Sequence, residues 1–231
     1  MDRRDFLKTV AVSGAAMTIQ RSEAMEILTQ AVNSTGKPDL VAVMGDEPEL
    51  MFQRAIAELG GMKQFVKSGQ KVVVKPNIGW DKVPELAGNT NPKLVAEIVK
   101  QCFAAGAKEV TVFDHTCDDW QKCYKNSGIE SAAKAAGAKV MPAHLESYYR
   151  PVDLPKGKNM KKAKIHEAIL NCDVWINVPI LKNHGGANLT IAMKNHMGIV
   201  WDRGYFHQND LQQCIACLLY TSPSPRDISG S

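Results

Sequence analysis

Short apolar runs rich in β-branched residues recur along this chain, and segments with helical periodicity separate them. The runs predict strands at 39–45, 70–77, 108–114, 138–143 and 172–181. Nearly continuous apolar strands are typical of a sheet that is buried on both faces, and intervening helices allow neighbouring strands to run parallel. The sequence therefore predicts an α/β fold, a mostly parallel sheet with helices on both faces.

Helix signals occupy the stretches between these runs. Helices are expected at 48–60, 91–107 and 127–136, and a further helix is expected from Asn188 to about Met197. The segment 91–107 carries the strongest signal, because a proline stands in its first turn and apolar residues repeat at helical spacing before a terminal glycine.

The first 24 residues resemble an export signal. The motif RRDFLK at 3–8 is similar to the twin-arginine motif, although Asp2 stands where Ser or Thr is usual. An uncharged stretch at 9–19 follows, and 22–24 has the small residues of a cleavage site. We expect a signal peptide at 1–24, the twin-arginine export machinery as a partner, and a periplasmic location. The alternative is a basic N-terminal helix in a cytosolic protein.

The C-terminal end reads CLLYTSPSPRD at 217–227, which looks like a translated transposase sequencing adapter. We interpret 217–231 as an adapter-derived artefact, and 25–216 as an α/β domain that is truncated at its C-terminus. A Ser/Pro-rich linker is the alternative interpretation. The Cys-x-x-Cys spacing of Cys214 and Cys217 is not treated as a motif, because its second cysteine falls in the adapter-like tail.

Composition excludes several classes of protein. The formal net charge of the 231 residues is +4, with 45% hydrophobic and 23% charged residues, and the small positive excess argues against nucleic-acid binding. No apolar run is long enough for a membrane span once the signal is cleaved. Between 25 and 216 the cysteines are odd in number and match neither a disulfide framework nor a zinc or iron–sulfur spacing. They are Cys102, Cys117, Cys123, Cys172 and Cys214.

Polar side chains gather where three predicted strands end. Lys75 and Asn77 end the second strand, Asp114 ends the third, and His184 follows the last. In open α/β sheets, ligands bind outside the carboxyl ends of the strands, so we expect these side chains to share a pocket. Each has a structural alternative: Lys75 could extend its amine to solvent, Asp114 could cap a turn, and His184 could be a satisfied loop histidine.

The segment 182–195 adds an expected anion site. Gly185-Gly186 precedes the helix predicted to begin at Asn188, and a helix N-terminus after a glycine turn offers free N–H groups to an anion. Lys194 lies in an apolar stripe of that helix and either extends to solvent or faces a pocket. The residues predicted to bind the ligand are Lys75, Asn77, Asn177, Lys182, Lys194 and Asn195.

His184 and Asp114 are the residues predicted to move a proton. His184, His196 and His207 with Asp114 are spaced too loosely to predict a metal site, so no metal ligand and no cofactor is assigned. The chain carries no dinucleotide fingerprint, P-loop, nucleophile elbow or zinc-protease motif. These motifs therefore assign no reaction.

Four sequence blocks in order resemble the bacterial and archaeal family of domains of unknown function numbered 362. They are Lys75-Pro76-Asn77, Thr90-Asn91-Pro92, Pro179 to His184, and Lys194 to Gly198. The resemblance covers roughly 70–216 and implies an α/β fold with a pocket, continued in other members by another α/β portion. Some members add a ferredoxin-like iron–sulfur module, whose cysteines are not visible here.

The sequence thus predicts an exported protein that binds an anionic small molecule at the carboxyl ends of its strands, where His184 and Asp114 are placed to transform it. Two alternatives stay open. One is a redox, iron–sulfur or metal accessory protein, and the other is a non-catalytic periplasmic binding protein.

Overall fold

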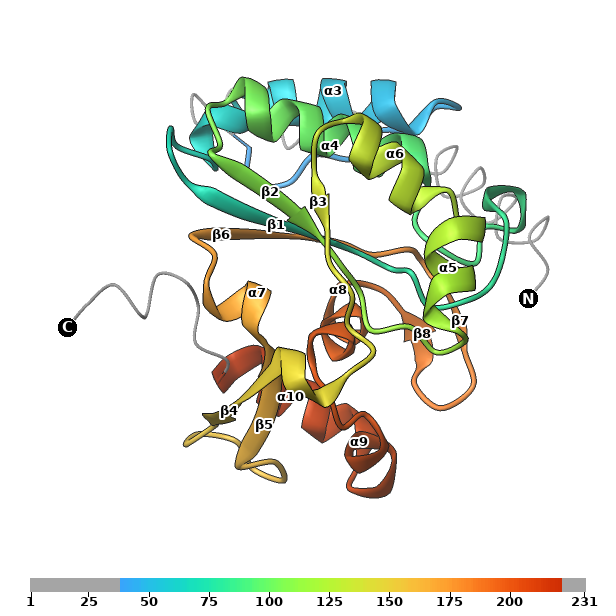
Figure 1. The fold of residues 1–231 in the computed structure, drawn as a ribbon, viewed down its shortest axis with the longest axis vertical. Coiled ribbons are helices and arrows are strands. Elements are labelled where there is room, and N and C mark those ends of the chain that lie inside the picture. The colour runs from blue at the N-terminus through green and yellow to red at the C-terminus, as the bar shows by residue number, and fades with distance from the viewer. Residues whose placement is uncertain (1–37, 222–231) are drawn as a thin grey trace, which may run out of the picture. The chain divides into compact units, whose positions relative to one another are not determined.

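A four-stranded parallel sheet forms the centre of the computed structural model, which describes residues 38–221 (Figure 1). Its order is β3-β2-β1-β6, and every pairing is parallel. The strands are β1 (Lys71–Pro76), β2 (Glu109–Val112), β3 (Lys139–Val140) and β6 (Val174–Val178). The carboxyl ends of all four strands therefore lie at one edge. The predicted α/β fold is confirmed, whereas the predicted signal at 1–24 and residues 222–231 of the predicted tail lie outside the described residues.

Helices before and after β1 cover one face of the sheet. They are α3 (Pro48–Glu58), α4 (Pro92–Ala104), α5 (Trp120–Asn126) and α6 (Ile129–Ala135). The strongest predicted helix is confirmed as α4, whose N-cap Asn91 accepts a hydrogen bond from the backbone N–H of Lys93. Val72 and Val74 of β1 pack into the core beneath these helices. Figure 1 shows α3, α4 and α6 together on this side.

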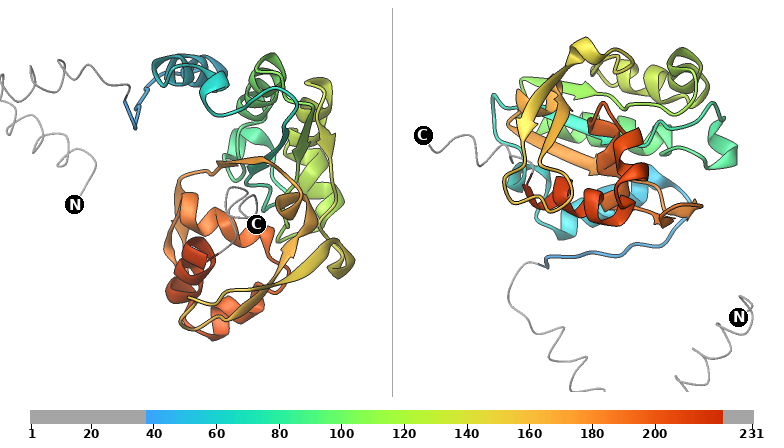
Figure 2. Two further views of the ribbon diagram at one scale, coloured as in Figure 1. Left: turned by 90° about the vertical axis from the view of Figure 1, so that its left-hand side faces the viewer. Right: turned by 90° about the horizontal axis from the view of Figure 1, so that it is seen from below.

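The opposite face carries a hairpin and three further helices that the structure describes (Figures 1 and 2). The elements are β4 (Tyr149–Asp153), β5 (Lys162–His166), α7 (Glu167–Leu170), α9 (Gly204–Gln208) and α10 (Leu211–Thr221). Val73 points into this second core, because alternate residues of a strand face opposite ways. Lys75, two residues further on, therefore lies on the same side as Val73.

Short 3₁₀ turns complete the described elements. They are η2 (Met62–Gln64), η3 (Pro84–Leu86), η4 (Glu146–Tyr148) and η5 (His196–Ile199). Between residues 38 and 221, none of the helices has both the length and the apolar character needed to cross a bilayer.

The strand predicted at 39–45 is wrong. No strand or helix forms between residues 38 and 47, and Leu40 and Met44 are 85% and 99% exposed. An apolar, β-branched pattern supplies strand propensity, but a strand also needs an edge with which its backbone can pair. The strand predicted at 138–143 shrinks to β3 for a related reason, since Pro142 has no N–H to donate to a ladder.

The helix predicted from Asn188 is also wrong. Residues Lys182–His184 (β7) and Asn188–Thr190 (β8) form an antiparallel hairpin, and α8 (Ala192–Asn195) is only four residues long. Asn188 has a left-handed φ of 58°, which suits the start of β8 after a glycine turn and not a helix cap. The expected anion site at a helix N-terminus is therefore absent at Asn188.

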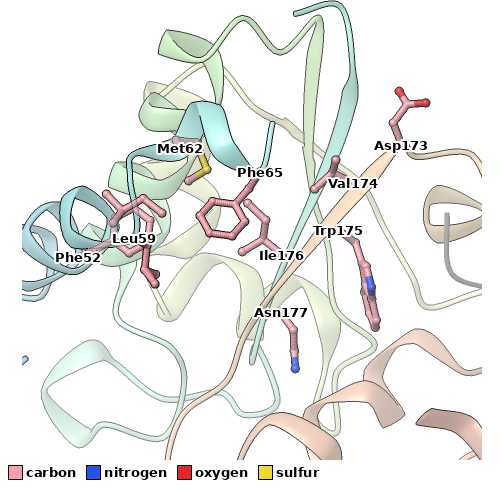
Figure 3. Close-up of a pocket in the computed structure, with 10 residues that line it drawn as sticks. Phe52, Leu59, Met62, Phe65, Asp173, Val174, Trp175, Ile176 and Asn177 are labelled. Carbon is pink, nitrogen blue, oxygen red and sulfur yellow. The ribbon is translucent and has the colours of Figure 1, made fainter. Parts of the chain in front are cut away.

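An apolar cavity of about 450 Å³ lies beside β6, the edge strand of the sheet. Phe52 of α3 and Leu59, which follows that helix, line it from one side, and Val174 and Ile176 of β6 line it from the other. Figure 3 shows Ile176 directed toward Phe65, with Trp175 on the opposite side of the strand. Among the predicted site residues, only Asn177 reaches this cavity.

The contrast between the helical core and the 39–45 segment gives a test of the fold. Ile98 of α4 is 2% exposed, so Ile98→Ala should lower the free energy of unfolding by about 2–5 kcal/mol. Met44→Lys should change it by less than about 0.5 kcal/mol, because the side chain is in solvent. Urea unfolding of the full chain measures both. A loss above about 1 kcal/mol for Met44→Lys would show that the segment packs.

Candidate functional site

A buried ion pair lies at the carboxyl ends of β1 and β2. Nζ of Lys75 is 2.7 Å from Oδ1 of Asp114, and the two side chains are 0% and 2% exposed. Nζ also donates to the Pro76 carbonyl at 2.9 Å, while Oδ2 of Asp114 accepts the Ile78 N–H at 2.7 Å. Burial lowers the pKa of Lys75, and the Asp114 carboxylate opposes that shift. The Lys75 amine therefore does not extend to solvent. The Asp114 carboxylate, which follows β2, contacts Lys75 and Ile78 at the end of the neighbouring strand β1.

Gly198 makes room for this ion pair. A Cβ atom at residue 198 would lie 1.9 Å from Oδ1 of Asp114 and 2.5 Å from Nζ of Lys75, far inside contact distance. The Gly198 carbonyl accepts the N–H of His115 at 3.2 Å, which holds η5 against the end of β2. The block from Lys194 to Gly198 thus needs a glycine at its end for a steric reason, because only a hydrogen atom fits over the ion pair.

Asn195 joins the ion pair to the neighbouring amides. Its Oδ1 accepts from Nζ of Lys75 at 3.0 Å and from Nδ2 of Asn77 at 3.1 Å. Its Nδ2 donates to Oδ1 of Asn177 at 2.8 Å. Lys75 and Asn177 are direct partners across β1 and β6, so their side chains leave the same face of the sheet. The structure therefore brings four predicted residues into one hydrogen-bond network.

Lys182 reaches the same network from β7. Its Nζ donates to Oδ1 of Asn77 at 2.9 Å and to the Gly88 carbonyl, and it lies 5.9 Å from the centre of the Trp80 ring. Burial is the main reason that the pKa of Lys182 is lowered, and Lys194 and Lys75 lower it further by repulsion.

A cavity of about 330 Å³ opens over these residues. It is lined by Lys75, Asn77, Gly79, Trp80, Asp114, His115, Cys117, His184, Lys194, Asn195, Met197, Gly198, Arg203, Gly204 and His207. Six of the predicted site residues are in this lining, and the other two, Asn177 and Lys182, are hydrogen-bonded to residues that are. Lys75, Lys194 and Arg203 face a single carboxylate, Asp114, which is already paired with Lys75.

Lys194 is the cation of this lining whose side chain has no partner among the described residues, whereas Arg203 donates to backbone carbonyls. Its side chain is half-buried, and it makes no hydrogen bond or ion pair to any residue between 38 and 221. Burial is the main cause that lowers the pKa of Lys194, and repulsion from Arg203 and Lys75 adds to it. The cavity therefore holds desolvated positive charge that the described part of the protein leaves unneutralised.

His184 has a defined protonation pattern. Its Nδ1 accepts the backbone N–H groups of Gly186 at 3.1 Å and Ala187 at 3.0 Å, so the neutral ring carries its hydrogen on Nε2. Its ring lies 6.4 Å from that of His207. Burial, followed by the Lys194 charge, lowers the pKa of His184. The side chain is therefore held as a neutral hydrogen-bond donor.

Arg203, which is not among the residues predicted to bind the ligand, ties two segments together. Its guanidinium donates to the carbonyls of His115, at 2.8 Å, and Thr116. It also lies 3.5 Å from Sγ of Cys117. Thr90 was likewise missed as a site residue: its hydroxyl accepts the Asn77 N–H and donates to the Val178 carbonyl. Contacts with backbone carbonyls leave no pattern in a single sequence. The one sequence signal for these two residues was that Thr90 lies in the block Thr90-Asn91-Pro92, which resembles the family.

The histidines and cysteines are dispersed. His196 packs edge-on against Trp175 and its Nδ1 is 2.8 Å from the Ala192 carbonyl, away from the His184–His207 pair. Within residues 38–221, no three His, Cys, Asp or Glu side chains are grouped in a way that could hold a metal ion. The cysteines Cys102, Cys117, Cys123, Cys172 and Cys214 form no disulfide, and of these five only Cys117 is exposed.

Comparison with known proteins assigns the family. Residues 72–226, more than half of the chain, match the family described as Domain of unknown function (DUF362), and the chain belongs to this family. The resemblance of the four sequence blocks is thereby confirmed, and every residue of the cavity lining falls in the matched range.

Among individual proteins, the chain is similar to the thylakoid-associated protein sll1697 of Synechocystis sp. (strain ATCC 27184 / PCC 6803 / Kazusa). The identity is 27% over 142 residues, which cover 62% of this chain and 43% of that protein. The chain therefore matches less than half the length of this relative. No solved structure matches the chain.

The close fit over the ion pair predicts the effect of adding one methyl group. Gly198→Ala should separate Lys75 from Asp114 and lower the free energy of unfolding by about 3–5 kcal/mol. Gly185→Ala is the matched control, because a Cβ there meets nothing within 4 Å and neither glycine has a positive φ. Urea unfolding compares the two variants. Equal stability would contradict the steric role of Gly198.

His115 predicts a loss of stability in acid. Its ring stacks on Trp201, and burial lowers its pKa from 6.5 to about 4. The unfolded chain takes up this proton first, so stability is intact above pH 6.5 and falls as pH drops toward 4. The wild type should lose about 3 kcal/mol more than His115→Gln over that range.

Urea unfolding at a series of pH values measures this difference. His207→Gln, a substitution at an exposed histidine, should behave as the wild type does. If His115→Gln and the wild type lose stability in parallel, His115 does not carry the acid sensitivity.

Proposed function

We propose that this protein binds a small anion, a carboxylate or phosphate group, in the cavity at the carboxyl ends of β1 and β2. One observation carries the proposal: Lys194 is a half-buried cation with no hydrogen-bond or ion-pair partner among residues 38–221. A desolvated charge without a partner is unfavourable, and a bound anion would offset that cost.

The neighbouring groups support the same chemistry. Arg203 lines the cavity, and Lys182 is bonded to Asn77 in the lining, while the one carboxylate present is paired with Lys75. The lowered pKa values of Lys182 and Lys194 have burial as their first cause and repulsion from neighbouring cations as a further one. A ligand with negative charge relieves that repulsion, which favours an anion over a neutral or cationic ligand.

The geometry favours binding roles for the two residues expected to move a proton. Nδ1 of His184 accepts two backbone N–H groups, which leaves Nε2–H as a donor to the anion and not as a base. Asp114 accepts the Ile78 N–H and pairs with Lys75, so it is a positioning residue that holds Lys75 and the end of β1. The proposal is therefore reversible binding. Of the functions that the sequence left open, a non-catalytic binding protein fits this geometry better than an enzyme that transfers a proton.

Thermal unfolding of the full chain with phosphate, acetate and citrate tests the proposal. At least one of these anions should raise the unfolding temperature, since a ligand that binds only the folded state stabilises it. Lys194→Gln should weaken the binding by about tenfold or more, the size expected for losing a charge-assisted contact. Lys108→Gln is the charge-matched control, because Lys108 is exposed and precedes β2 at the opposite edge of the sheet.

Two results would refute anion binding in this cavity. The first is the absence of any shift with all three anions. The second is an equal loss of affinity in Lys194→Gln and Lys108→Gln, which would assign the effect to net charge.

A further inference from the structure

A second cavity, of about 590 Å³, adjoins the polar one. It lies between the β4–β5 hairpin and the segment from Val200 to Tyr205. His115, Arg203 and Gly204 line both cavities. The two spaces therefore share a wall, and a single molecule can contact both.

The second cavity differs in chemistry from the first. Its walls include the apolar and aromatic side chains of Met160, Val200, Trp201 and Tyr205. Aromatic walls suit a planar, apolar group, because stacked and edge-on contacts add to the area that is buried.

The lysines at this second cavity are paired with carboxylates, and the Asp202 carboxylate accepts the Tyr205 N–H. Lys164 pairs with Glu146, and Nζ of Lys162 is 3.7 Å from Oδ1 of Asp153. Unlike Lys194 in the first cavity, these lysines do not need a ligand to supply a counter-charge.

Backbone and ring contacts fix the position of the second cavity relative to the first. The Trp201 N–H donates to the Lys164 carbonyl at 3.0 Å, and Ile165 and Val200 form an antiparallel bridge, so the hairpin is tied to the segment that follows η5. His115 stacks on Trp201 with ring centres 5.2 Å apart and planes 2° apart. Because His115 also lies at the end of β2, the aromatic wall is fixed relative to the polar cavity.

We infer that the two cavities bind two parts of one ligand, an aromatic acid whose anionic group lies in the polar cavity and whose planar ring lies against Trp201 and Tyr205. Arg203 stands between the parts, where a guanidinium can meet a carboxylate at its edge and a ring on its face. The volumes of both cavities fall in the range of small-molecule sites. This inference rests on the proposed anion binding and adds the class of ligand.

Titration calorimetry of the full chain with acetate, decanoate, 2-naphthoate and 2-naphthylmethanol tests this inference. 2-Naphthoate should bind at least about tenfold more tightly than acetate, because its ring removes apolar surface from water. It should also bind more tightly than decanoate, which presents a flexible chain to the aromatic wall, and than 2-naphthylmethanol, which has no charge.

Variants locate the two halves of the site. Trp201→Leu should remove most of the advantage of 2-naphthoate over acetate, and Tyr205→Leu, at a more exposed residue, should reduce it if Trp201→Leu does not fold. Trp120→Leu is the matched control, because Trp120 stacks on His144 and lines neither cavity. Lys194→Gln should weaken acetate and 2-naphthoate by a similar factor.

The outcomes separate the two proposals. If acetate binds and 2-naphthoate binds no more tightly, the two-part ligand is refuted while anion binding stands. If decanoate equals 2-naphthoate, or Trp120→Leu has the effect expected of Trp201→Leu, the aromatic wall does not select the ligand and the inference fails. If none of the acids binds, the aromatic-acid inference fails, and the phosphate arm of the unfolding test then decides whether anion binding stands.

Discussion

The rest of the site depends on the buried pair between Lys75 and Asp114. Two charges removed from water cost several kcal/mol each, and their attraction offsets this only with good geometry and further hydrogen bonds. Here Pro76, Ile78 and Asn195 supply those bonds. The pair therefore constrains its surroundings. The backbone after β1 must present the Ile78 N–H to Asp114, and α8 must place the Asn195 side chain against Lys75.

Part of this arrangement could be predicted from the sequence. Parallel strands place their carboxyl ends at one edge, so Lys75 and Asp114 were expected together from the alternation of strands and helices alone. The helix α4 could be predicted because its proline, apolar spacing and terminal glycine all agree. These features are local or follow from a general rule of parallel sheets, and neither needs a knowledge of tertiary contacts.

The rest depends on contacts distant in sequence. The glycine turn at 185–186 was interpreted as leading to a helix, but the pairing of β7 with β8 decides the conformation of Asn188, and propensity is too weak to compete with it. Lys194 and Asn195 lie at the expected site, but they belong to a four-residue helix. Their position was therefore predicted correctly, although the long helix from which it was predicted does not form. The contacts of Arg203 are with backbone carbonyls that any residue type presents, so the sequence could not predict those contacts.

The division of charge within the cavity explains why one lysine is structural and another is available. Asp114 is the carboxylate of the lining, and the closest cation, Lys75, takes it at a depth where no solvent competes. Gly198 closes over that pair, so Asp114 cannot turn toward Lys194 without losing the Ile78 N–H and the Lys75 amine together. Lys194 therefore stays without a counter-charge, because the buried pair holds the carboxylate that would otherwise neutralise it. The oxyanion of a ligand can take the position next to Lys194 that Asp114 does not occupy.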